Sequence, residues 1–418
     1  MNNRYRPVFF ILLLVHIGGA LAQNDETETP LLLQMMARVP LIPESQDLSL
    51  PLSYIDYRAL ESTVPGLAAF SDYAEFAQAD DARRASWFAA MGRLESSPGS
   101  YVYSDLIANQ AMEALPQVVG FDFFAINQGV YWGQPPANGT FFFGDLGPET
   151  IRAAFADRDY TREADGDVEV WCPPKGCDSG SLVDVRGRNL ANPFGGNIGR
   201  QEPIILGDGW VFSGRGFDSQ AAVLAGDAPS LLALPQFSAI ARALLNHGTV
   251  LQLQFVYPLE LNGETHNLYL ARRPEVREAM MAEVQSVLEV SLPPYSLVAI
   301  ADLADGDDDI AVIALAYSDE VAAQAAGPAL LERLQSATQV SSEQPVMTLL
   351  EERRLSIAAP LVIADERGWF VTLLSFRQPR PSTQSDAAAA DGAGYSLLMN
   401  LLNQKDLLWL AHEFAVQD

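Results

Sequence analysis

Several predicted strands of this chain are apolar on both faces. Phe141, Phe142 and Phe143 are consecutive, so aromatic side chains point to both sides of their strand. The segment 310–317 is apolar throughout. A half-exposed antiparallel strand alternates apolar and polar residues, and these segments do not. Their second face therefore needs cover, which could come from a sister domain, the N-terminal segment, an apolar ligand between domains or a partner protein.

The order of predicted elements repeats along the chain. Each half contains a helix, a β-hairpin, a helix, a second hairpin and a last helix. The clearest local match pairs 203–212 with 360–371, where proline, three aliphatic residues, Asp, Gly, Trp and an apolar pair recur in order. The repeat predicts an α+β fold of two similar modules, each made of antiparallel β-hairpins covered by helices in a ferredoxin-like manner. It indicates an internal duplication; the alternative is that apolar hairpins with Gly-Trp turns resemble one another by chance.

The length of the chain predicts more than one domain. At 418 residues it exceeds what one ordinary hydrophobic core holds. We expect an N-terminal segment over residues 23–50, a first α+β domain over 51–246 and a second over 247–418. Residues 378–394 are rich in Pro, Ser, Gln, Ala and Gly, a composition that predicts a disordered loop within the second domain.

The first 22 residues have the layout of a secretory signal peptide. Arg4 and Arg6 precede an apolar run over 8–15, and small residues lead to an Ala-Leu-Ala sequence that ends at Ala22. The apolar run is too short to span a bilayer comfortably, and no later run approaches that length. We therefore expect cleavage after Ala22 and a mature protein that is secreted, periplasmic or on the cell surface, without a transmembrane span.

The charge of the chain excludes one class of partner. It has 53 acidic and 26 basic residues, and its formal net charge is −27. Such a surface repels nucleic acid, whose binding requires clusters of Lys and Arg. With 49% hydrophobic and 19% charged residues, the composition is that of a globular chain. The expected partner is an unidentified protein or an apolar ligand.

The chain has two cysteines, Cys172 and Cys177. In an oxidising compartment, two cysteines this close in sequence predict a disulfide. Their spacing differs from the Cys-x-x-Cys of redox motifs, and a zinc site needs about four ligands. We therefore expect a structural disulfide and no metal site.

Motifs for catalysis or for cofactor binding are missing. His247, His266 and His412 follow the signal peptide, but none lies in an H-E-x-x-H motif, and the chain lacks G-x-S-x-G. The acidic run 305–309 could bind calcium, although it lacks EF-hand spacing and a solvated turn is the simpler interpretation. The glycine-rich stretch 192–199 lacks the Lys-Ser/Thr of a phosphate loop. We therefore predict no catalytic residue and no cofactor.

These features favour an exported, non-enzymatic two-domain protein that acts as a scaffold or in an interaction. Two alternatives stay open. The apolar strands also fit a carrier of an apolar small molecule bound between the domains. An extracellular hydrolase would need carboxylates or a histidine that converge in a cleft.

The signal peptide generates the first prediction. N-terminal sequencing of the exported protein should begin at Gln23, because the A-x-A pattern places the cleavage site after Ala22. A mature protein that retains Arg4 and Arg6 would contradict the expected secretion.

Overall fold

The computed structural model describes most of the chain after the predicted signal peptide. The described residues are 29–41, 52–94, 106, 111–134, 137–165, 168–177, 183, 185–214, 217–256, 261, 289–339, 342–380, 393–404 and 406–411. The signal peptide, His266 and His412 lie outside these residues, so the predictions made for them stay predictions.

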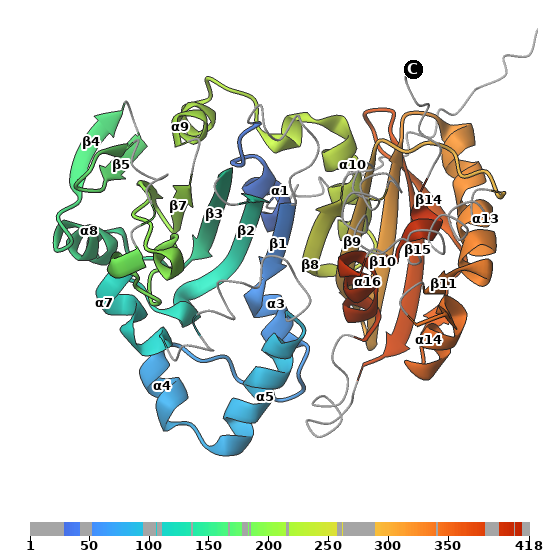
Figure 1. The fold of residues 1–418 in the computed structure, drawn as a ribbon, viewed down its shortest axis with the longest axis horizontal. Helices are drawn as coiled ribbons and strands as arrows, with labels where there is room; N and C mark the ends of the chain where they lie inside the picture. Colours follow the sequence, from blue (N-terminus) through green and yellow to red (C-terminus); the bar gives the residue numbers. More distant parts are fainter. Residues whose placement is uncertain are drawn as a thin grey trace, which may run out of the picture.

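The described part of the first half forms seven strands, β1 to β7 (Figure 1). Its helices are α1 (Leu31–Met36), α3 (Tyr57–Ser62), α4 (Tyr73–Gln78), α5 (Asp81–Gly92), α7 (Leu115–Val119), α8 (Pro148–Ala156), α9 (Phe217–Ala225) and α10 (Pro235–Leu245). Its short 3-10 helices are η2 (Met112–Ala114), η3 (Phe123–Ala125), η5 (Val185–Gly187), η6 (Gly196–Ile198) and η7 (Leu231–Ala233). Its strands are β1 (Leu52–Asp56), β2 (Ile126–Gln134), β3 (Ala137–Gly144), β4 (Thr161–Asp165), β5 (Val168–Cys172), β6 (Ile204–Gly207) and β7 (Trp210–Gly214).

The second half begins with β8 (Thr249–Val256). Its further strands are β9 (Leu297–Asp305), β10 (Asp308–Tyr317), β11 (Thr338–Gln339), β12 (Gln344–Pro345), β13 (Ser356–Ile357), β14 (Leu361–Ala364) and β15 (Phe370–Pro379). Its described helices are α13 (Glu320–Ser336), α14 (Val346–Glu352), α16 (Ala393–Asn403) and η9 (Leu408–Leu410).

Aspartates begin several of these helices. Their side chains accept hydrogen bonds from backbone N–H groups of the first turn, which leaves fewer of these donors unsatisfied. The capping residues are Asp56 for α3, Asp72 for α4, Asp80 for α5 and Asp319 for α13.

One antiparallel sheet runs through both halves. In the described residues it has 13 strands, in the order β13-β15-β10-β9-β8-β1-β2-β3-β7-β6-β5-β4, with β14 paired to β15. The halves meet where β1 pairs with β8, with Leu52 opposite Phe255 and Ile55 opposite Gln252. The structure is therefore a mixed α+β fold around a single large sheet (Figure 1).

Outward from the β1–β8 pair, the strand order in the two halves corresponds. It is β1-β2-β3-β7-β6 in one direction and β8-β9-β10-β15-β14 in the other. In each half a helix, α8 or α13, follows the first hairpin. The later strand of the second hairpin then pairs beside the first hairpin. Strands β4 and β5 extend the outer edge of the first half beyond this common order.

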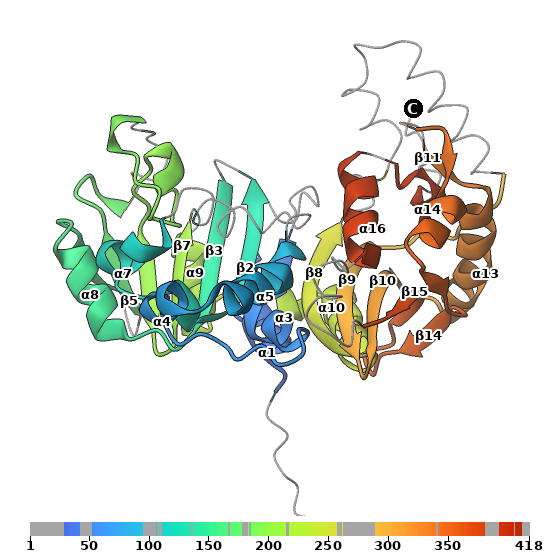
Figure 2. The same cartoon turned by 90° about the horizontal axis from the view of Figure 1, so that it is seen from below.

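Helices of the chain cover the sheet on both faces. On one face, α1 and α10 pack on strands of both halves and form what we call the junction core. On the other face each half has its own core, beneath α3, α5 and α8 in the first half and beneath α13, α14 and α16 in the second. Figure 2 shows α10 and α16 on opposite sides of the second-half strands.

This arrangement accounts for the strands that are apolar on both faces. Phe141 is fully buried in the junction core, and its neighbour Phe142 is fully buried in the first-half core. In β10, Val312 and Ile313 alternate in the same way between the junction core and the second-half core. The apolar second faces are thus covered by the chain itself, including its N-terminal helix α1.

The two tryptophans of the sequence repeat lie at similar places. Trp210 and Trp369 each follow a hairpin turn, are half-buried and pack against the junction core. On the strands before these turns, Ile205 and Ile363 face the junction core, whereas Val362 packs against the second-half core. The sequence match pairs Ile205 with Val362. In the structure the residue that faces the junction core as Ile205 does is Ile363, one position later.

The predicted disordered loop over 378–394 is wrong at both ends. Strand β15 continues to Pro379 because it pairs along the whole length of β10, with Asp308 opposite Pro379. At the other end, α16 begins at Ala393. Residues 381–392 lie outside the described part, where the prediction remains untested.

A buried ionic cluster ties the first half to the second. Arg93, which follows α5, donates to Asp302 at 2.7 and 3.1 Å and to Asp309 at 2.9 Å. Arg380 donates to the other oxygen of Asp309 at 2.9 Å. Gln252 donates to the Arg93 carbonyl at 3.0 Å and to Asp302 at 3.2 Å. Although burial lowers it, the attraction of the two carboxylates raises the pKa of Arg93 above its ordinary value, so the guanidinium stays charged.

This cluster generates the second prediction. Arg93→Ala should lower the free energy of unfolding by about 3–5 kcal/mol, because it leaves the buried Asp302 without its cation and Asp309 with Arg380 alone. Urea denaturation measures the change. Arg84→Ala on α5 is the control, since Arg84 pairs with the exposed Asp81 and exposed pairs contribute little. Equal losses in the two variants would contradict the role of the cluster.

Candidate functional site

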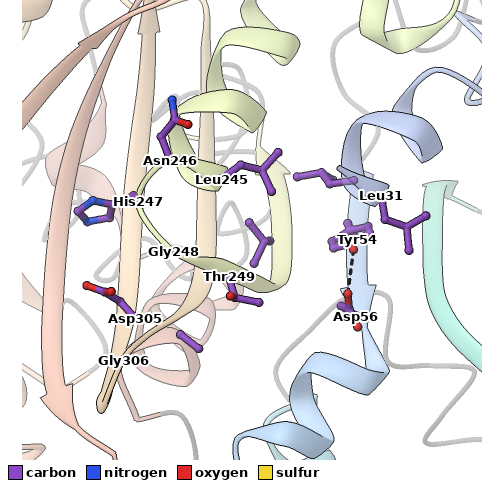
Figure 3. A pocket seen from close by; sticks show the side chains of 13 residues that line it. Leu31, Tyr54, Asp56, Leu245, Asn246, His247, Gly248, Thr249, Asp305 and Gly306 are labelled. Carbon is purple, nitrogen blue, oxygen red and sulfur yellow. Dashed lines mark hydrogen bonds between the residues drawn. The ribbon is translucent and has the colours of Figure 1, made fainter. Parts of the chain in front are cut away.

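A pocket of about 480 Å³ opens at the junction of the two halves (Figure 3). The first half contributes β1, with Tyr54 and Asp56, and α1, with Leu31 and Leu32. The second half contributes the start of β8 and the β9–β10 turn, and α10 leads into β8 along one wall. Because both halves build it, the pocket exists only when β1 and β8 are paired.

Two side chains of β1 are among the polar groups of the pocket. Tyr54 and Asp56 are two residues apart, so they point to the same face of the strand. Asp56 Oδ1 accepts a hydrogen bond from the backbone N–H of Ala59 at 2.8 Å and thereby caps α3. Its Oδ2 accepts from the Tyr54 hydroxyl and from Gln128 Nε2, each at 3.3 Å. These donors are neutral, as is the backbone N–H of Arg58, which also hydrogen-bonds to the carboxylate, and the two bonds to Oδ2 are long.

The environment of Asp56 disfavours its charge. Burial raises the pKa of Asp56 above its ordinary value, against the opposing effect of its hydrogen bonds to Ala59, Gln128 and Tyr54. Burial, followed by the nearby Asp56 carboxylate, raises the pKa of Tyr54 well above its ordinary value. Beside them, Gln128 is buried, and its Oε1 has no hydrogen-bond partner among the described residues. A perturbed carboxylate next to an unsatisfied amide, in an open pocket, is typical of a binding site.

The wall opposite Asp56 is apolar and lies at a helix end. Leu245 faces β1 across the pocket (Figure 3), and Val250 also lines it. Helix α10 ends at Leu245, and the C-terminal end of a helix carries partial negative charge. Among the described residues that line the pocket there is no Lys or Arg. The pocket is thus electronegative and has an apolar wall.

His247 and Asp305 line the rim on the side away from Asp56 (Figure 3). The Nε2 atom of His247 is 3.0 Å from the Ser375 hydroxyl. Asp305 accepts from Arg377 at 3.3 Å. Burial, followed by the charge of Arg377, lowers the pKa of His247 below its ordinary value, against the opposing effect of Asp305. Ser375 is buried, and Asp305 is paired with an arginine, so the two do not form a complete catalytic triad with His247.

The predicted disulfide between Cys172 and Cys177 is present at the end of β5. Their sulfur atoms lie within 4.8 Å of a carboxylate oxygen of Glu163, a grouping that could hold a metal only if the cysteines were reduced. As a disulfide the pair has no thiolate to offer.

Arginines form ion pairs with carboxylates of the predicted acidic turn. Asp305 and Asp308 pair with Arg377, and Asp309 pairs with Arg93 and Arg380. Because cations of the chain already neutralise these groups, the structure favours a turn over a calcium site.

Sequence reasoning missed Tyr54 and Asp56 of the pocket. Their two-residue spacing is visible in the sequence, but nothing local indicates the pocket in front of them.

Comparisons with known proteins add little to this geometry. No family model and no curated protein matches the chain. A solved structure titled as crystal form I of TP0453 matches with 7% sequence identity over 82% of this chain and 93% of that chain, at a TM-score of 0.29. A likeness this weak carries no argument about fold or function. Among the described helices, none is both long and apolar enough to cross a membrane.

The third prediction follows from the raised pKa of Asp56. Because its pKa is raised in the folded protein, its ionisation costs stability at neutral pH, and this cost disappears as the pH falls through that pKa. Asp56→Asn keeps a good helix cap. The variant should therefore be more stable than the parent at pH 7, with the difference shrinking toward pH 4. Thermal unfolding at a series of pH values measures this; a variant that is less stable at pH 7 would show that the carboxylate is there to stabilise the fold.

Proposed function

We propose that this chain is an exported, non-enzymatic interaction protein, a scaffold of two modules that binds its partner or ligand in the junction pocket. The observation that carries the proposal is the composition of this pocket. Both halves build it, and its central carboxylate, Asp56, has only neutral donors and a raised pKa. A group that is costly to keep ionised and that faces an open pocket is better explained by binding than by folding.

We also propose that the two modules arose by duplication. Supporting this are the corresponding strand orders on either side of the β1–β8 pair and the similar positions of Trp210 and Trp369. A pocket at the boundary between two such modules is a common place for a ligand, because the boundary supplies groups from both. Duplication would thus explain why the site lies at the junction.

An apolar carrier is less well supported. It was suggested by strands that are apolar on both faces, and helices of the chain already cover these faces. The junction pocket, moreover, combines its apolar wall with Tyr54, Asp56 and Thr249.

A hydrolase is supported by one specific contact, the 3.0 Å distance between His247 and Ser375. Ser375 is buried, so a substrate could reach its hydroxyl only if strand β15 or the α10–β8 connection moved. A fluorophosphonate probe that labels Ser375 would favour this alternative and contradict the proposal.

The proposal generates the fourth prediction. Native mass spectrometry of the protein isolated from its own host should show a bound ligand or partner, and Thr249→Trp should remove it by filling the pocket. Thr161→Trp is the matched control, since Thr161 is an exposed threonine at the start of β4. A bound mass that both variants retain, or a parent protein that never carries one, would contradict binding in this pocket.

A further inference from the structure

We infer that the junction pocket binds an alkylammonium group, that is, a protonated amine on a short aliphatic chain. The inference rests on the proposed function, since it names the chemical class of the ligand for the same pocket. Its three supports are the charge at Asp56, the apolar wall opposite and the charge of the chain around the pocket.

The first support is a pair of neighbouring acceptors, Asp56 on β1 and Gln128 on the adjacent strand β2. Asp56 Oδ2 has two neutral donors, each at the long distance of 3.3 Å, and Gln128 Oε1 is buried without a partner among the described residues. A primary ammonium offers three donors and a positive charge. Hydrogen bonds between charged groups are shorter and stronger than those between neutral ones. A cation in front of Asp56 therefore supplies what its present partners lack.

The second support is the shape and lining of the pocket beyond the carboxylate. Leu31, Leu32, Leu245 and Val250 line it, and they give an aliphatic chain an apolar surface. The volume of about 480 Å³ is in the range of pockets that hold small organic molecules. A bare divalent cation fits less well, because it needs several oxygen ligands. Among the described lining residues the other carboxylate is Asp305, which lies on the far rim (Figure 3).

The third support is electrostatic selection. The negative end of α10, the absence of Lys and Arg from the described part of the lining and the net charge of −27 all disfavour an anion. The sequence just before α1 carries Asp25, Glu26 and Glu28 and no basic residue. We assign the ammonium group to another molecule, either a free amine or the lysine side chain of a peptide.

Isothermal titration calorimetry with three six-carbon probes tests the inference at pH 7. n-Hexylamine should bind, 1-hexanol should bind at least tenfold more weakly, and hexanoate should show no binding. Asp56→Asn should weaken hexylamine binding at least tenfold and leave hexanol unchanged. Asp319→Asn is the matched control, because Asp319 caps α13 through the Ala322 N–H at 2.8 Å, as Asp56 caps α3. Hexylamine affinity should be unchanged in this control.

Two further arms separate the sources of the ammonium group. A blocked Gly-Lys-Gly peptide that binds more tightly than hexylamine would assign the site to lysine side chains, and the reverse order would assign it to free amines. Equal affinities for hexylamine and hexanol, or full affinity in Asp56→Asn, would overturn the inference. If hexylamine fails to bind the parent while a bound mass remains sensitive to Thr249→Trp, the cation inference is wrong and the proposed function stands.

Discussion

The pairing of β1 with β8 is the constraint on which the rest of this structure depends. Its ladder joins residues about two hundred positions apart, with Ser53 opposite Gln254 and Tyr54 opposite Leu253. Without it the halves would be two smaller sheets with exposed edges, which proteins normally protect. With it, α1 and α10 can pack on strands of both halves, and Tyr54 comes to face Leu245. The junction core and the pocket therefore form together.

Buried polar groups at the junction hold this pairing in register. Ser53 donates to Gln254 across the ladder, and Gln252 donates to Asp302 and to the Arg93 carbonyl. A slip of one residue would turn Ser53 and Gln254 into the junction core, where they would lose these partners. Apolar burial alone tolerates many arrangements, whereas a connected polar network stabilises one. The Arg93 cluster therefore contributes specificity to the pairing of the two halves. The opposite face of the sheet packs against the apolar junction core.

The sequence predicts features that depend on near neighbours. The hairpins, the disulfide of Cys172 with Cys177 and the need to cover both faces of the strand around Phe142 can be read locally. The single sheet cannot, because no short-range pattern indicates that β1 pairs with β8. The same reason hides the site, since the importance of Asp56 depends on Gln128 and Leu245, which are distant in sequence. Even the loop boundary at Pro379 depended on pairing with β10, which overrode a composition typical of disorder.

Asp56 links the cost of folding to the proposed binding. As the cap of α3 it holds one oxygen toward a backbone N–H, and this role could be filled equally by Asn or Ser. The second oxygen is what distinguishes an aspartate, and here it meets only the long, neutral contacts of Tyr54 and Gln128. Its charge is therefore poorly compensated by the chain itself. A cationic ligand would compensate it, and by linkage such a ligand would stabilise the folded state in which β1 and β8 are paired. Binding and the joining of the two halves are thus expected to reinforce each other.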